Sequence, residues 1–133
     1  MSIHYPLSED LTPYGLLLTP LLPLQVSTLY GWRRFRFLLD SGADYTTVPE
    51  SLAELIGIDI TRCPRAQVFG IEDRPVSARV SSITIRLGSE TIALRCHFLE
   101  GGGASYLLGR MDFFTRFNIS FQNDQRLVSF KRI

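Results

Sequence analysis

The chain has 133 residues, of which 45% are hydrophobic and 20% charged, the composition of an ordinary globular domain. Its 14 basic and 13 acidic side chains leave a formal charge of only +1. Because binding to nucleic acid generally needs an excess of basic side chains, we expect no nucleic-acid partner.

The first half of the chain is predicted to form a lead-in segment, a hairpin and one helix. Residues 1–14 mix prolines, serine and acids without periodicity and are interpreted as an N-terminal arm, followed by one domain over residues 15–133. Residues 21–28 are apolar and 33–39 alternate before two leucines, which predicts a hairpin whose second strand enters the core. Residues 49–57 predict a short helix, because proline suits its first turn and glycine can end it.

The second half is predicted to be mainly β-structure. Five stretches are rich in β-branched and apolar residues and are separated by turn residues. These stretches are residues 66–71, 76–87, 90–99, 118–122 and 127–131. A very apolar segment at 106–108 and a helical turn around 111–117 lie between the third and the fourth. Many short strands with one or two short helices predict an all-β domain, closed or sandwiched.

The sequence predicts no cofactor, no metal site and no export. Cys63 and Cys96 form no C-x-x-C pair, and no nearby histidine or cysteine would complete a zinc site. His4 and His97 are far apart and belong to no metal or hydrolase motif. The N-terminus lacks the basic region of a signal peptide, and the apolar run 16–26 is too short to cross a bilayer. We expect reduced thiols, with a disulfide between them left open, no membrane partner and a cytoplasmic location.

A carboxylate follows directly on an apolar strand at Asp40. The residues before it are Phe-Leu-Leu, and Ser41 and Gly42 come next. The strand would hold the acid near the core, and the glycine allows backbone N–H groups to approach the carboxylate. The serine hydroxyl can bond to a neighbouring backbone group. By itself the tripeptide favours a β-turn, since all three residue types are common in turns.

The wider context resembles the active-site loop of the retropepsins, the dimeric aspartic proteases of retroviruses and their cellular relatives. The tripeptide is followed by Ala43, then by Thr46-Thr47-Val48-Pro49 and the predicted helix. Downstream, Leu107-Leu108-Gly109-Arg110 and Asp112-Phe113-Phe114 resemble the second family signature, whose aliphatic residues and glycine pack beneath the catalytic loop. The resemblance covers residue 21 to the C-terminus and implies a closed acid-protease barrel, one lobe per chain.

The resemblance also implies roles for individual residues. Asp40 is the expected catalytic residue, Ser41 would tie the two active-site loops together across a dimer, and Gly42 would contact substrate through its backbone. Ala43 and Asp44 are expected in the substrate cleft. Support for the loop is expected from Leu107, Leu108, Gly109 and Arg110.

Two further expectations follow from the resemblance. Arg110, the basic residue after the second signature, should form an ion pair with Asp44. A β-hairpin flap should cover the cleft, and its candidate residues are Phe69, Gly70 and Ile71. Three charged residues follow them, whereas viral flaps are glycine-rich and apolar at the tip.

The chemistry of this class needs two carboxylates that share a proton. Only Asp40 precedes a hydroxyl residue and a glycine, so one chain supplies one such acid. A homodimer with both Asp40 residues on a two-fold axis is therefore expected, acting on peptides or unfolded polypeptides at mildly acidic pH. If the termini take part in the dimer, residues 127–133 would be interface strands.

Two other functions are left open. A retropepsin-fold dimer could recognise extended peptides by strand addition without turnover, which the charged flap favours mildly and the intact Asp-Ser-Gly disfavours. A ligand-binding β-barrel would be monomeric and would make Asp40 a turn residue. A stacking surface for bases is not expected, because the aromatic side chains near the C-terminus are interpreted as core. These are Phe113, Phe114, Phe117, Phe121 and Phe130.

Overall fold

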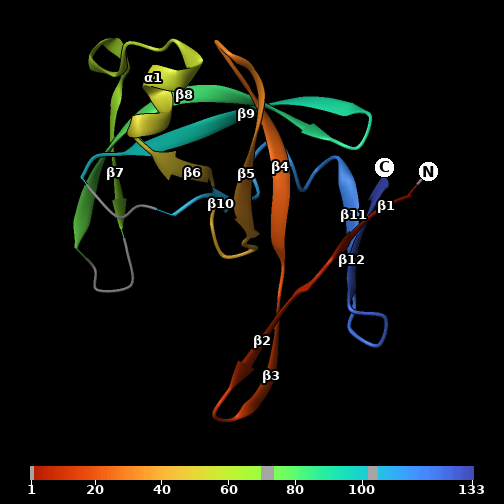
Figure 1. The fold of residues 1–133 in the computed structure, drawn as a ribbon. Helices are drawn as coiled ribbons and strands as arrows, with labels where there is room; N and C mark the ends of the chain where they lie inside the picture. Colours follow the sequence, from red (N-terminus) through yellow and green to blue (C-terminus); the bar gives the residue numbers. More distant parts are fainter. Residues whose placement is uncertain (1, 70–73, 102–104) are drawn as a thin grey trace.

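Strands make up most of the chain (Figure 1), and the computed structural model describes residues 2–69, 74–101 and 105–133. The N-terminal elements are β1 (Ser2–Pro6), β2 (Ser8–Thr12), β3 (Gly15–Thr19), β4 (Leu21–Thr28), β5 (Gly31–Leu39), β6 (Thr46–Pro49), α1 (Ser51–Ile56) and the 3₁₀ turn η1 (Ile60–Arg62). The C-terminal elements are β7 (Arg65–Phe69), β8 (Pro75–Leu87), β9 (Glu90–Leu99), β10 (Leu107–Leu108), β11 (Phe117–Gln122) and β12 (Leu127–Arg132).

The main sheet closes on itself. Its seven strands follow the order β4-β5-β10-β6-β9-β8-β7, and β4 also pairs with β8. This closing contact joins Gln25 to Arg86 and Val26 to Ile85. Because β8 is thirteen residues long, it can pair with β9 along most of its length and still reach β7 and β4. The predicted all-β closed domain is confirmed.

The core of this barrel comes from alternate residues of its strands. In β4 every second residue is buried, and the same alternation runs through the second half of β8 and through β9. A period of two is what a strand with one covered face requires. The inward residues of these strands are Leu22, Leu24, Val26, Ile83, Ile85, Leu87, Ile92, Leu94, Cys96 and Phe98.

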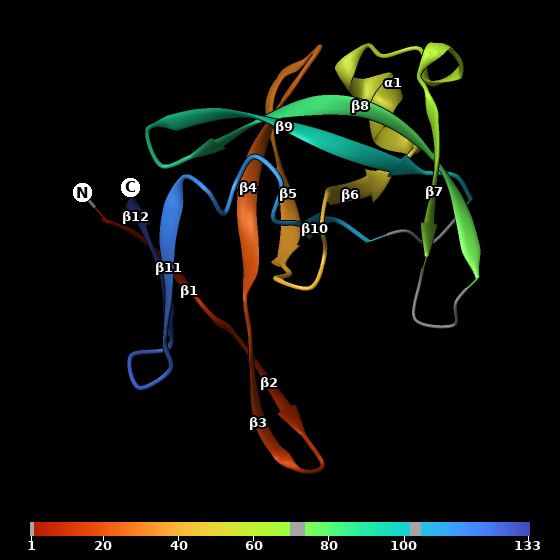
Figure 2. The same ribbon diagram turned by 180° about the vertical axis from the view of Figure 1, so that it is seen from behind.

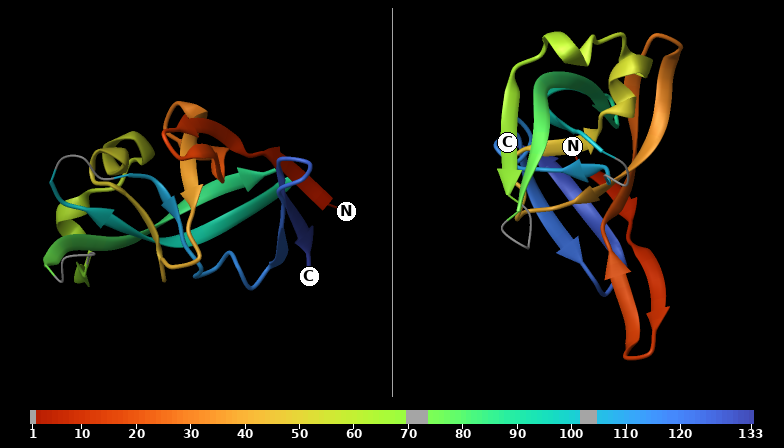
Figure 3. Two further views of the ribbon diagram at one scale, coloured as in Figure 1. Left: turned by 90° about the horizontal axis from the view of Figure 1, so that it is seen from below. Right: turned by 90° about the vertical axis from the view of Figure 1, so that its left-hand side faces the viewer.

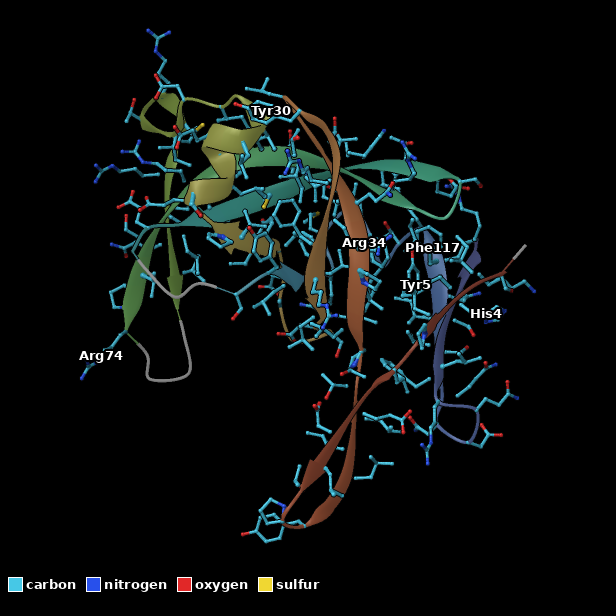
Figure 4. The ribbon with its side chains drawn as sticks, in the orientation of Figure 1. His4, Tyr5, Tyr30, Arg34, Arg74 and Phe117 are labelled. Carbon is cyan, nitrogen blue, oxygen red and sulfur yellow. The ribbon has the colours of Figure 1, made fainter. Side chains whose placement is uncertain are left out.

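A second sheet joins the two ends of the chain, in the order β1-β12-β11 (Figures 1 and 2). β1 pairs antiparallel with β12, with Ile3 opposite Phe130. Phe130 is fully buried, and both Tyr5 and Phe117, labelled in Figure 4, pack edge-on against it. Leu7, which follows β1, is also buried. Residues 1–14 were expected to be a lead-in segment, but β1 and β2 lie within them and β1 belongs to the body of the domain.

The predicted helix is present as α1, which ends at Gly57 in the left-handed conformation (φ 80°). The helical turn expected at 111–117 is a series of turns instead. Its N–H groups do bond back to Arg110 and Phe113, but Asp112 takes a positive φ of 66°, which a regular right-handed helix does not allow. Within the described ranges, no helix is long and apolar enough to span a membrane.

Candidate active site

Asp40 stands at the end of the most deeply buried part of β5. Phe37 and Leu39 are buried, and Leu39 pairs in parallel with Leu108 of β10. The Asp40 N–H continues this pairing by donating to the Leu108 carbonyl oxygen (3.0 Å). The backbone of Asp40 is therefore fixed by the sheet, and its half-buried side chain lies where strand changes to loop.

The loop after Asp40 turns back on the carboxylate. Gly42 N–H donates to Asp40 Oδ1 (2.9 Å), and Ala43 N–H donates to the Asp40 carbonyl oxygen (3.2 Å). A Cβ on Gly42 would lie 3.2 Å from the same Oδ1, so a side chain there would press on the carboxylate. The close approach of a backbone N–H group to the carboxylate, which this glycine was predicted to allow, is thus present.

The second motif lies directly beneath this loop. Gly109 is buried and its N–H donates to Thr46 Oγ1 (3.2 Å). A Cβ at position 109 would collide with the backbone carbonyl of Tyr45 and would lie 2.8 Å from the backbone nitrogen of Thr46. Only glycine lets the two backbones approach this closely. Thr46 is fully buried, and its hydroxyl as the partner of Gly109 was not foreseen from the sequence.

Arg110 closes the loop from outside. Its side chain donates to Asp44 Oδ1, the ion pair that the sequence predicts, and its N–H donates to the Ala43 carbonyl oxygen (2.9 Å). Met111 N–H donates to the Asp44 carbonyl oxygen (2.8 Å). The backbone carbonyl oxygens of Ala43 and Asp44 thus accept hydrogen bonds within the chain, and the substrate-cleft position of these two residues stays a prediction. Both charged side chains of the ion pair are more than half exposed, so we assign it little stabilising energy.

A hollow of about 270 Å³ lies beside the loop that follows Asp40. The exposed Ser41 lines it, together with residues of the turn before β11 and of β11 itself. The full lining is Leu39, Ser41, Phe114, Phe117, Asn118, Ile119 and Phe121. Phe121 was expected in the core but is 52% exposed; it lies towards the end of β11, on the same face as the buried Phe117, where that face borders the hollow. No sequence pattern predicted this apolar surface next to Ser41.

Asp112, which belongs to the second motif, anchors the turn after Gly109 to β9. Its carboxylate accepts from the Arg95 backbone N–H (2.9 Å) and from the Arg95 guanidinium (2.8 and 2.9 Å). These hydrogen bonds lower the pKa of Asp112 from 3.8 to about 2. The positive φ of Asp112 directs its side chain away from a helical path, and no short motif predicts this pairing.

Asp112→Asn is expected to make stability less dependent on acid pH. Since the folded pKa is depressed to about 2 from 3.8, the carboxylate stabilises the fold above about pH 4, and this contribution is lost as pH falls towards 2. Asparagine tolerates the positive φ, so the change mainly removes the charge. Thermal midpoints should differ most above about pH 4 and converge near pH 2. Asp124→Asn is the control for the loss of one negative charge. A difference in thermal midpoint between the wild type and Asp112→Asn that stays constant at every pH would contradict the assignment of the lowered pKa to Asp112.

The candidate flap residues are only partly described. Phe69 ends β7, whereas Gly70 and Ile71 lie outside the described residues. β7 pairs with β8, and Arg74, labelled in Figure 4, directly precedes β8. The antiparallel pair β7 and β8 therefore flanks the segment in which the flap is expected, and the flap itself stays a prediction. Within the described ranges, no cluster of three or more histidine, cysteine or acidic side chains could hold a metal ion.

Comparison with known proteins places this geometry in a family. Residues 28–116 match the family model described as gag-polyprotein putative aspartyl protease. Among solved structures, a retropepsin-like aspartic protease from Rickettsia conorii is 16% identical, with a TM-score of 0.65, covering 98% of this chain and 91% of that one. The EIAV protease in complex with the inhibitor HBY-793 is 19% identical, with a TM-score of 0.52, covering 69% and 82%. No curated protein gave a significant match. At these identities the solved structures establish the fold alone.

Proposed function

Because this chain belongs to the family of gag-polyprotein putative aspartyl proteases, we propose that it is an aspartic endopeptidase that works as a homodimer. Each chain supplies one catalytic residue, Asp40. The observation that carries this proposal is the position of Asp40, which the sheet holds through Leu108 and the loop holds through Gly42. The Gly42 hydrogen bond is one that an ordinary turn aspartate also makes, so the support for the proposal comes from the pairing with Leu108 of the second motif.

The chemistry requires the Asp40 carboxyl groups of two chains to share one proton. The ionised carboxylate takes a proton from a water molecule, whose oxygen attacks the carbon of the peptide carbonyl. The protonated carboxyl group donates its proton to the carbonyl oxygen. When the resulting tetrahedral intermediate collapses, the C–N bond breaks, the leaving nitrogen takes the proton that the first carboxylate removed from water, and a hydroxyl group of the intermediate returns a proton to the second carboxylate. One chain alone cannot perform both roles, because it contains one Asp-Ser-Gly sequence.

The surface around Ser41 supports the assembly in pairs. Ser41 is exposed, although it follows a residue fixed by the sheet, and it borders the apolar hollow next to β11. A second copy placed with its Asp40 close to this one would cover the hollow and bring the two Ser41 hydroxyls near each other. Ser41 is therefore proposed to donate across the dimer to the backbone of the partner's loop.

Ser41→Ala is expected to weaken the dimer. If two symmetric hydrogen bonds each stabilise it by about 1 kcal/mol, the dissociation constant should rise about thirtyfold. Sedimentation equilibrium measures this constant directly. Ser89→Ala, on the exposed turn between β8 and β9, is the matched control and should leave it unchanged. If Ser41→Ala leaves the dimer dissociation constant unchanged, the Ser41 hydroxyl does not form a hydrogen bond across the dimer.

The substrates are proposed to be peptides or unfolded polypeptides, cleaved within extended apolar stretches. The test is digestion of a peptide library at controlled pH and at several protein concentrations. Specific activity should rise with concentration until the dimer saturates and should be greatest at mildly acidic pH, where one of the two carboxyl groups keeps a proton. Binding of library peptides without cleavage would instead support the non-catalytic peptide-binding module.

A further inference from the structure

The hairpin of β2 and β3 projects away from the rest of the chain. It forms a two-stranded sheet of its own, and the right-hand view of Figure 3 shows it standing clear of the barrel and of the terminal sheet. At its outer end Tyr14 is fully exposed and Leu11 is 88% exposed. An isolated two-stranded hairpin is only marginally stable in water. Exposed apolar residues on such a hairpin therefore indicate a surface that another protein surface covers.

One face of this hairpin carries an apolar strip from the body to the tip. Cross-strand pairing places Leu11 opposite Leu16 and Glu9 opposite Leu18, and these two pairs share a face because they are two residues apart. Leu18 packs against the core. Leu11 and Leu16 continue the same face outward and are exposed. We call Leu11, Leu16 and the adjacent Tyr14 the arm face.

The arm face presents apolar surface rather than charge. The acidic residue on the same side of the hairpin, Glu9, lies outside the arm face, near the body, and forms an ion pair with Arg126 of the same chain. The other face carries Asp10 opposite Leu17. An uncharged apolar strip suits a partner surface that becomes fully buried, as the core of a homodimer interface does.

The arm points to the side on which a second copy must lie. In Figures 1 and 2 the hairpin extends past the end of β5, in the direction of the loop that carries Asp40. If the two Asp40 residues share a proton, the second copy lies on that side of the molecule. The root of the arm is also continuous with the terminal sheet, because β1 leads into β2 through the buried Leu7. That sheet includes β11, which lines the hollow beside Ser41.

We propose that the β2–β3 hairpin is a clasp that packs the arm face against a second copy of the chain. By two-fold symmetry each chain contributes one clasp, so the dimer gains two contacts outside the catalytic loops. This inference rests on the proposed function, because that function places the second copy beside the arm. The clasp stabilises the dimer and takes no part in the reaction.

The test compares two faces of the same hairpin. The triple variant Leu11→Ser, Tyr14→Ser, Leu16→Ser removes the arm face, and Leu17→Ser removes an exposed leucine from the opposite face. In sedimentation equilibrium the triple variant should raise the dimer dissociation constant at least about a hundredfold, since six anchoring side chains are lost from the dimer. Leu17→Ser should match the wild type. Above its new dissociation constant, the triple variant should recover wild-type specific activity, because Asp40 is unchanged.

The outcomes separate this inference from the proposed function. A wild-type dimer with peptidase activity, together with an unchanged constant in the triple variant, would overturn the clasp alone. A wild type that stays monomeric at every concentration would overturn both. If the triple variant does not fold, a photoreactive p-benzoylphenylalanine at position 14 of the otherwise unchanged chain replaces it. Crosslinked product of twice the chain mass supports the clasp, and crosslinks confined to one chain, or none between two, overturn it.

Discussion

Replacing Asp40 with asparagine is expected to reduce peptidase activity by roughly a thousandfold or more, since both general acid and general base are lost from the dimer. The fold should survive, because the sheet holds residue 40 through its backbone N–H and the Leu108 carbonyl oxygen. An asparagine Oδ1 can still accept the Gly42 N–H that Asp40 accepts. The measurements are the initial rate on a cleaved library peptide and the thermal midpoint.

The matched control for this change is Asp124→Asn. Asp124 lies in the exposed turn between β11 and β12, so the substitution alters net charge equally without touching the site. It should leave the rate at the wild-type level. Wild-type cleavage by Asp40→Asn would remove Asp40 from the reaction. A large fall in its thermal midpoint would mean that the carboxylate is needed for folding instead.

Gly109→Ala should have the largest effect on stability, a loss of about 3 kcal/mol or more. The added Cβ would overlap the backbone of Tyr45 and Thr46, and backbone cannot move aside as the end of a flexible side chain can. Any relaxation would push the loop away from β10 and shift Asp40 with it. Urea unfolding at one fixed protein concentration measures the loss, because dimerisation would make stability depend on concentration.

Gly101→Ala is the matched control for this prediction. Gly101 has a positive φ of 94°, but no atom lies within 4 Å of a Cβ built there. The change should therefore cost only about 1 kcal/mol, the strain of alanine in a left-handed conformation. If Gly109→Ala cost no more than this control, the close approach beneath the loop would not be a structural requirement.

The strand pattern and the site motifs could be read from the sequence because both depend on neighbouring residues. The bounds of β4 and β9 were predicted without error, since alternation and flanking turn residues define them. The Asp-Ser-Gly and Leu-Leu-Gly-Arg segments come together through the pairing of β5 with β10, which the family resemblance anticipated. The predicted cytoplasmic location stays a prediction.

The features missed from the sequence depend on residues far apart in the chain. β1 looks irregular by itself and becomes a strand because β12 supplies its partner. The pairing of Asp112 with Arg95 depends on one positive φ, which asparagine or glycine would signal more clearly than aspartate does. The β2–β3 hairpin exposes its leucines, contrary to the usual rule that apolar residues point inward, and the local pattern of apolar residues does not show that they stay exposed.

The most direct test of two carboxyl groups from two chains is to mix active and inactive subunits. Wild-type protein is held at a fixed concentration at which it is dimeric, Asp40→Asn is added, and the mixture is left to exchange before assay with excess substrate. A mixed dimer holds only one Asp40, so a ninefold excess of the variant should lower activity to about one tenth by random pairing. Activity that stays constant as the variant is added would show that one chain catalyses alone, and would contradict the shared site.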